Sequence, residues 1–148
     1  MLLACLALAI VAPSLSAWSH GTQLRDLADQ FVSLTRLARS RAVADGFNYR
    51  INIDAKGGTY QLMVEGGGNF VPMQSAWGRL FTMPDGIELQ LLSSTGGAPD
   101  QPAIDFYPTG RVQPATVKIT SARGETIQIN CPSPAEGFVI AQPNGGAR

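Results

Sequence analysis

The first twelve residues, Met1–Ala12, read MLLACLALAIVA, and they run into a longer helical pattern that decides how the chain is organised. No Lys, Arg, Asp or Glu occurs among the first 24 residues. Pro13 interrupts the apolar run, Trp18 closes it, and charges begin only at Arg25. A helix that starts without charge and continues with a water-soluble face is not the pattern of an ordinary surface helix.

The apolar segment is short for a membrane span. A helix rises about 1.5 Å per residue and the hydrocarbon core is about 30 Å thick, so a span needs about 20 apolar residues. Residues 1–12 cover about 18 Å, and residues 1–17 still fall short. Three interpretations are open: a cleaved signal peptide, a buried core helix, and a membrane helix whose beginning is missing from this chain.

The residues favour the third interpretation. A signal peptide could be cut at the small residues of 14–17, but it normally begins with basic residues, which are absent here. A run of Leu, Ala, Ile and Val is hard to enclose on all sides in a domain this small. In a membrane helix, Trp18 would lie at the headgroup boundary, and Pro13 is tolerated where neighbouring helices satisfy the freed carbonyl.

The pattern from Leu24 onward predicts an amphipathic helix that ends at Asp45. Apolar side chains recur at helical spacing on one face, and charged or hydroxyl side chains occupy the other. Gly46 is a natural stop signal, and we expect the apolar face to pack against the rest of the chain. The apolar face contains Leu24, Leu27, Ala28, Phe31, Leu34, Ala38 and Ala42, and the polar face contains Arg25, Asp26, Asp29, Ser33, Arg36 and Ser40.

After Gly46 the period changes to two, which predicts strands. Residues 47–54 alternate apolar and polar side chains, turn at 55–58 and return over 59–64 as a hairpin that the glycines at 66–68 end. An exposed loop is predicted at 93–102. Further strands are predicted at 86–91, 103–107, 115–120, 126–130 and 137–141, with a hairpin turn at 121–125.

Together these elements predict an α+β fold, in which one long helix packs on an antiparallel sheet of about six or seven strands. The predicted organisation is an apolar transmembrane part over 1–18, an amphipathic stalk over 19–46, a β-rich globular domain over 47–141 and a flexible tail over 142–148. The β region has enough residues for one modest core.

Composition argues against several partners and chemistries. Eleven Lys and Arg balance eleven Asp and Glu, so no net field attracts nucleic acid or anionic lipid. Cys5 lies in the apolar segment and Cys131 in the β region, so no disulfide within the domain is expected. The one histidine, His20, is interpreted as an interfacial polar residue, because a catalytic pair or an imidazole metal site would need further partners beside it.

The acidic and aromatic residues do not indicate a metal site or a nucleic-acid-binding site either. Asp54, Asp85, Asp100 and Asp105 lie singly in or beside predicted turns, where Asp commonly bonds its own backbone. A Ca²⁺ site from loop oxygens stays open, although no spaced series of Asp and Asn supports one. The glycines at 66–68 lack the Lys of a phosphate-binding loop, and the aromatic residues are interpreted as packing. We therefore expect no catalytic residue, no cofactor and no metal.

Several stretches resemble a known family. Residues 37–42 (LARSRA) close the stalk, and residues 104–111 (IDFYPTGR) form a strand and turn that end in Pro-x-Gly-Arg. These stretches, the apolar helix leading into Pro13, the hairpin at 117–129 and the final GFVI at 137–140 follow one another in a familiar order. The chain resembles the H-type minor pseudopilins of type II secretion systems, the GspH/FimT group of type IV pilin-like proteins.

The resemblance implies a non-catalytic structural subunit of the type II secretion pseudopilus, anchored in the inner membrane by one helix, with its C-terminal domain in the periplasm. Its partners would be other major and minor pilin-like subunits, and nucleic acid is not expected. The apolar segment would lie first in lipid and then in the core of a filament, and Pro13 would let the helix bend during that transfer. The residues given this role are Leu2, Leu3, Leu6, Leu8, Ile10, Pro13, Leu15 and Trp18.

One difference from the family concerns the start of the chain. Family members begin with a basic leader and a Gly-Phe-Thr-Leu-x-Glu-like prepilin peptidase site, and this sequence shows none. Alignment on Pro13 places Met1 inside the membrane helix, which agrees with the short span, so we expect a start codon placed too late or a truncated sequence. For a full-length chain the resemblance implies the prepilin peptidase as a further partner, and methylation.

Two alternatives stay open. A minor pilin of a type IV pilus, acting in pilus assembly or DNA uptake, would have the same parts, although the near-neutral β domain argues against strong DNA binding. An exported soluble β domain that acts as a binding module would result from cleavage near Ala17.

Overall fold

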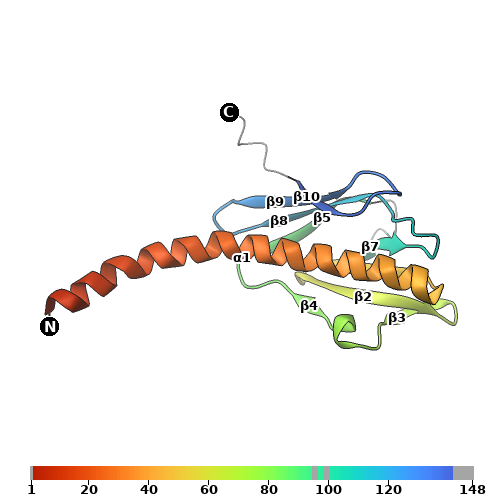
Figure 1. Cartoon of the computed structure of the whole chain (residues 1–148), viewed down its shortest axis with the longest axis horizontal. Coiled ribbons are helices and arrows are strands. Elements are labelled where there is room, and N and C mark those ends of the chain that lie inside the picture. The colour runs from red at the N-terminus through yellow and green to blue at the C-terminus, as the bar shows by residue number, and fades with distance from the viewer. Residues whose placement is uncertain (1, 95–96, 99–100, 142–148) are drawn as a thin grey trace.

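A single helix, α1 (Leu2–Asp45), forms the first part of the chain. The computed structural model describes residues 2–94, 97–98 and 101–141, with side chains from 23 to 92 and from 102 to 141. At about 1.5 Å per residue, the 44 residues of α1 extend about 66 Å. The C-terminal half of α1 lies along the β strands, and its N-terminal half projects beyond them (Figure 1).

The end of α1 confirms the predicted stop. Gly46 follows the helix with φ +75°, and its amide N donates to the Ala42 carbonyl O at 3.0 Å. This left-handed conformation is one that glycine adopts without strain, so it closes the last turn. The helix is continuous through Pro13. Among the described residues, no helix combines the length and the apolar character needed to cross a bilayer.

The strands form two antiparallel sheets, so the prediction of a single sheet was wrong. The first sheet contains β1 (Tyr49–Asp54), β2 (Thr59–Gly66), β3 (Asn69–Pro72), β4 (Phe81–Thr82), β6 (Gly97–Ala98) and β7 (Gln101–Phe106). Its order is β3-β2-β1-β7-β6, and β4 pairs with the start of β2. The second sheet contains β5 (Glu88–Ser94), β8 (Ala115–Thr120), β9 (Thr126–Cys131) and β10 (Val139–Ala141), in the order β10-β9-β8-β5.

Most predicted strands are present. The predicted first hairpin is β1 and β2, with Ile51 opposite Leu62. β8 has the predicted bounds, and the bounds of the other predicted strands shift by up to three residues. The tail 142–148 lies outside the described residues.

The glycines at 66–68 end the first hairpin as predicted, because β2 ends at Gly66 and the next two glycines, Gly67 and Gly68 with φ +63° and +88°, turn the chain into β3. One local prediction was wrong. The loop predicted at 93–102 contains the end of β5, β6 and the start of β7, and its residues 95–96 and 99–100 lie outside the described residues. β3, β4 and the short 3-10 helix η1 (Ala76–Gly78) had no signal that the sequence analysis recognised.

The stalk half of α1 packs with both sheets in one core. The predicted apolar face is confirmed, since all of its residues are buried except the partly buried Leu27. Every residue of the predicted polar face is exposed. Alternation in the strands supplies the other walls of the core: Ile51 from β1, Leu62 from β2 and Ile129 from β9 are all fully buried.

Aromatic rings join the three layers. The Phe31 ring of α1 meets the Tyr60 ring of β2 edge-on, with centroids 5.1 Å apart, and the Phe138 ring beside β10 at 6.4 Å. The Tyr60 ring in turn stacks on Phe81 at 5.1 Å, and Phe106 lies 6.3 Å from Phe138. Phe31 is therefore the point at which the helix contacts aromatic residues of both sheets.

Candidate functional site

The residues predicted to form the membrane and filament helix all lie in the N-terminal part of α1, on the portion that projects beyond the sheets (Figure 1). Their side chains are outside the described set, so their role stays a prediction. The backbone places them on one continuous helix with the stalk. This continuity is required if the segment is to anchor the β domain. These residues are Leu2, Leu3, Leu6, Leu8, Ile10, Pro13, Leu15 and Trp18.

At the opposite end of α1, Arg39 joins the helix to both sheets. Its Nε donates to the carbonyl O of Gly110 at 2.8 Å, in the turn after β7 of the first sheet. Its Nη2 donates to the carbonyl O of Ala135 at 3.2 Å, in the connection between β9 and β10 of the second sheet. The amide N of Val112 also donates to the Pro134 carbonyl O at 2.9 Å, which links the two connections directly. We call this cluster the Arg39 junction.

The Arg39 junction brings together the two stretches, 37–42 and 104–111, that carried the family resemblance. Gly110 has φ +87°, a region in which side chains are strained, and its amide N donates to the Tyr107 carbonyl O at 2.9 Å. A Cβ on Gly110 would lie 3.7 Å from Val43 Cγ2, which is ordinary contact. The backbone conformation, not lack of space, therefore explains the glycine.

The second sheet contributes a buried thiol beside this junction. Cys131 is free, and its Sγ donates at 3.3 Å to the carbonyl O atoms of both Ser133 and Glu136. Burial raises the pKa of the Cys131 thiol. A buried, protonated thiol that bonds its own loop is a structural group, not a nucleophile.

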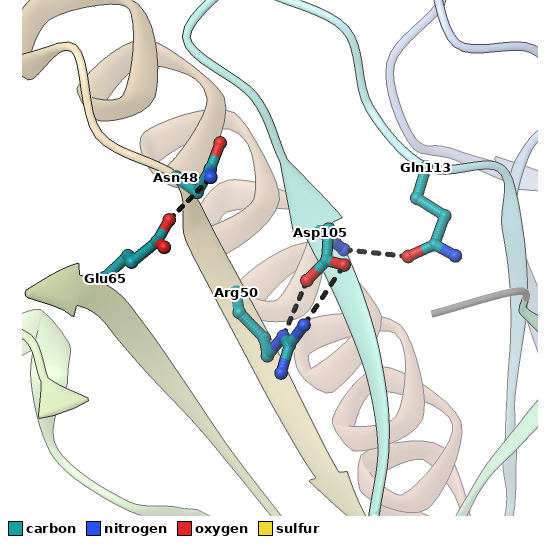
Figure 2. Close-up of polar contacts among 5 residues, drawn as sticks. All are labelled: Asn48, Arg50, Glu65, Asp105 and Gln113. Carbon is teal, nitrogen blue, oxygen red and sulfur yellow. Dashed lines mark hydrogen bonds and ion pairs between the residues drawn. The ribbon is translucent and has the colours of Figure 1, made fainter. Parts of the chain in front are cut away.

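A polar cluster lies on the outer face of the first sheet (Figure 2). Arg50 of β1 forms a two-bond ion pair with Asp105 of β7, with distances of 2.6 Å from Nε to Oδ1 and 3.3 Å from Nη2 to Oδ2. The Arg50 guanidinium also lies 4.0 Å from the centre of the Phe70 ring. The Asp105 amide N donates to Gln113 Oε1 at 3.1 Å, and Asn48 Nδ2 donates to Glu65 Oε2 at 2.6 Å.

This cluster corrects the prediction for Asp105, which was expected to bond its own backbone at a turn. Asp105 lies in a strand, and its register opposite Arg50 on the neighbouring strand is what pairs the two charges. Asp54 does behave as predicted, because its Oδ1 accepts from the Gly57 amide N at 3.1 Å. The interpretation of the aromatic residues as packing is confirmed for Phe81, which is 3% exposed, but it is wrong for Trp77, which is 46% exposed.

The described side chains contain no cluster of three or more His, Cys, Asp or Glu that could hold a metal ion. His20 lies in α1, and its side chain is outside the described set. The prediction that the chain has no catalytic residue stays a prediction.

A long helix that is half packed on antiparallel sheets and half projecting defines a pilin-like protein. The family model "Type II transport protein GspH" matches residues 27–131, and the chain belongs to this GspH family. The family is one of structural pseudopilins that assemble with other pilin-like subunits. No curated protein gives a significant match in sequence.

Solved structures of other pilin-like proteins share the fold. The minor pseudopilin EpsH of the Vibrio cholerae type II secretion system has a TM-score of 0.70 at 16% identity, over 82% of this chain and 98% of that one. The solution structure of E. coli GspH has a TM-score of 0.66 at 19% identity, over 86% of this chain and 93% of that one. The type IV minor pilin FimU of Pseudomonas aeruginosa has a TM-score of 0.60 at 16% identity, over 88% of this chain and 96% of that one.

Proposed function

We propose that this protein is a non-catalytic minor subunit of a type II secretion pseudopilus. The observation that carries the proposal is the division of α1 into two halves of different surroundings. The stalk half is fixed to both sheets by Phe31 and by the Arg39 junction. The other half projects from the β domain with an uncharged sequence.

The proposed mechanism uses one apolar surface in two environments. The projecting half would lie in the inner membrane, with the β domain in the periplasm. Apolar side chains on every side of a helix are compatible with lipid and equally with a bundle of similar helices. Removal of the helix from lipid into a filament would therefore exchange one apolar surrounding for another, while the β domain stays outside and contacts other pilin-like subunits.

The membrane placement can be tested by fractionation. We expect the protein in its native host to remain with the inner membrane after a high-salt wash, because the attachment is apolar and not electrostatic. A β domain found free in the soluble periplasm, with its N-terminus after residue 16 or 17, would refute the anchored subunit and support the exported binding module.

The function can be tested by complementation. Deletion of the gene should abolish export of a type II secreted enzyme, and the native chain should restore it. Ile10→Asp, which places a charge in the projecting half, should fail to restore export. Thr82→Asp, at the exposed position of β4, is the matched control and should restore it. Normal export in the deletion strain would contradict the proposal.

A second candidate function is supported by the similarity to FimU, a type IV minor pilin. In that case the same deletion strain would export normally but would lose surface pili. The two phenotypes can be scored in one strain, so each candidate has a result of its own.

A further inference from the structure

The β1–β2 hairpin and the connection between η1 and β4 line a hollow of about 620 Å³. Asn52 of β1 and Gln61 of β2, which are opposite each other in the register, form part of its lining. Their neighbours along the strands, Ile51 and Leu62, are fully buried, so alternation places both amides on the outer face of the first sheet. The hollow therefore adjoins this outer face, and its volume is that of a ligand pocket.

The Asn52 amide is a polar group that the fold leaves unpaired in this hollow. Its side chain is partly buried, and it makes no hydrogen bond among the described residues. Gln61, in contrast, is held in place, because its Nε2 donates to the Gly78 carbonyl O at 2.9 Å. A side-chain amide has both donors and an acceptor, as the main chain of an extended peptide has. The Asn52 amide can therefore bond the main chain of a peptide that lies in the hollow.

Leu80 gives the hollow an apolar wall on a rigid connection. Its side chain lines the hollow and is 53% exposed. Just before it, the Gly78 amide N donates to the Ser75 carbonyl O at 3.0 Å, and a Cβ on Gly78 would overlap the Met73 carbonyl O. An apolar side chain on a connection that is already ordered loses little conformational entropy on binding. Leu80 is thus suited to contact an apolar side chain of a partner.

The charges around the hollow select an acidic partner. Lys56 lines the hollow and Arg79 precedes Leu80, and both side chains are exposed. Among the described residues neither cation has an ion pair, although the Arg79 guanidinium lies 4.1 Å from the centre of the Phe81 ring. Asp54 also lines the hollow, but its Oδ1 already accepts a hydrogen bond from the backbone of its own turn. Two unpaired cations beside one engaged carboxylate favour a partner with carboxylates.

We propose that this hollow binds an extended segment of a partner protein in which an apolar residue is flanked by Asp or Glu. The main chain of the segment would bond the Asn52 amide, and its apolar side chain would contact Leu80. Its carboxylates would approach Lys56 and Arg79. The inference does not depend on the proposed function, because it uses only contacts of the β domain.

Three fluorescent peptides test the chemistry of the occupant on the full chain in mild detergent. The acidic apolar peptide is Gly-Glu-Leu-Glu-Gly, the basic peptide is Gly-Lys-Leu-Lys-Gly, and the peptide without an apolar side chain is Gly-Glu-Ser-Glu-Gly. Fluorescence anisotropy measures binding, with detergent alone as the blank. We expect the acidic apolar peptide to bind at least about fivefold more tightly than either of the others. Equal binding of the three peptides, or no saturable binding up to about 1 mM, would overturn the proposal.

Substitutions in the hollow locate the binding. Leu80→Ala and Asn52→Ala should each weaken binding of the acidic apolar peptide about fivefold, because each removes one contact of the segment. Leu92→Ala and Gln128→Ala are the matched controls, at exposed positions of the second sheet, and should change the affinity less than about twofold. Equal weakening in the hollow and at the control positions would overturn the proposed site.

Charge reversal gives a readout that a change in folding would not produce. Lys56→Glu should weaken binding of the acidic apolar peptide about fivefold and strengthen binding of the basic peptide by a similar factor. A variant that merely unfolds the hairpin would lose both peptides. Lys118→Glu, on β8 of the second sheet, is the control and should leave the preference unchanged. An unchanged preference in Lys56→Glu would contradict the proposed role of this cation.

A second copy of this chain is the alternative occupant. Sedimentation of the full chain in the same detergent detects it as self-association. Self-association that Leu80→Ala abolishes, with no binding of the acidic apolar peptide, would identify the second copy as the occupant and overturn the proposal. Binding of the peptide by a chain that sediments as a monomer supports it.

Discussion

Truncation of Phe31 should remove the contact that holds the stalk to both sheets. Its side chain is fully buried, and its ring meets Tyr60 at 5.1 Å and Phe138 at 6.4 Å. Phe→Ala changes in cores cost about 3–5 kcal/mol, which includes aromatic pairs worth about 0.5–1.5 kcal/mol each. A domain of this size has only about 5–15 kcal/mol in total. Phe31→Ala should therefore lower the free energy of unfolding by about 4 kcal/mol and Tm by at least about 12 °C.

The assay is urea unfolding of the full chain in mild detergent, followed by circular dichroism of the β domain. Phe47→Ala is the matched control, because Phe47 is 54% exposed and its truncation should cost less than about 0.5 kcal/mol. If Phe31→Ala does not fold, Phe31→Leu keeps part of the volume and should cost about 1–2 kcal/mol. A loss below about 1 kcal/mol for Phe31→Ala, or equal losses at the two positions, would show that the stalk is not fixed through this ring.

Three further changes test the surroundings of the helix. Burial raises the pKa of Tyr60 to about 12 from 10.0, and its hydroxyl has no hydrogen-bond partner among the described residues. Tyr60→Phe should raise the free energy of unfolding by up to about 1 kcal/mol near neutral pH. Above pH 10 the tyrosines of the unfolded chain ionise first, so the native chain should lose more urea resistance between about pH 10 and 12 than this variant, which keeps Tyr49, whose pKa burial also raises to about 12. Tyr107→Phe, which changes an exposed tyrosine, is the control and should lose as much as the native chain. Arg39→Ala should lower the free energy of unfolding in urea by about 2 kcal/mol, because two hydrogen bonds from a charged donor are lost. Arg41→Ala, at an exposed position, should lower it by less than about 0.5 kcal/mol. Gly110→Ala should cost about 1 kcal/mol in the same assay because of its φ of +87°, and an unchanged midpoint would contradict the strain argument.

The stalk and the first hairpin could be predicted from sequence because both depend on local periodicity. Burial of one helix face follows from apolar residues spaced by three and four, and Ala28 and Leu34 are fully buried as expected. The glycine stop at Gly46 is equally local, since a single residue with positive φ closes the helix. The family resemblance added the prediction that these local elements form a pilin-like fold.

The division into two sheets could not be predicted in the same way. β3 and β4 have four and two residues, too few for alternation to be recognised. Which strands are neighbours depends on contacts between distant segments, and the pairing of β7 with β1 is such a contact. For this reason the strand predicted at 103–107 could include Asp105 but could not give it Arg50 as a partner.

The Arg39 junction was missed for a related reason, although one signal for it was present. Arg39 lies on the flank of α1, between the buried Ala38 and the exposed Ser40, where a long cationic side chain can reach backbone carbonyls of a packed domain. The sequence does not show which carbonyls those are, because they belong to turns about 70 and 95 residues away. Their positions depend on the two-sheet arrangement itself.

The position of the junction explains how a movement of the helix would reach the β domain. A pull along α1 towards its N-terminus would act on the stalk in shear, and the contacts between stalk and sheets would share the load. Phe31 lies near the middle of the packed half, and Arg39 lies closer to its end, so the aromatic contacts and the two charge-assisted hydrogen bonds act at different heights on the same helix. Because Arg39 bonds a carbonyl in the turn after β7 and another in the connection between β9 and β10, the load at that level passes to segments joined to both sheets. A chain that is pulled by its helix needs such a connection between helix and sheets. The hydrogen bond from Arg39, in residues 37–42, to Gly110, in residues 104–111, is one such connection.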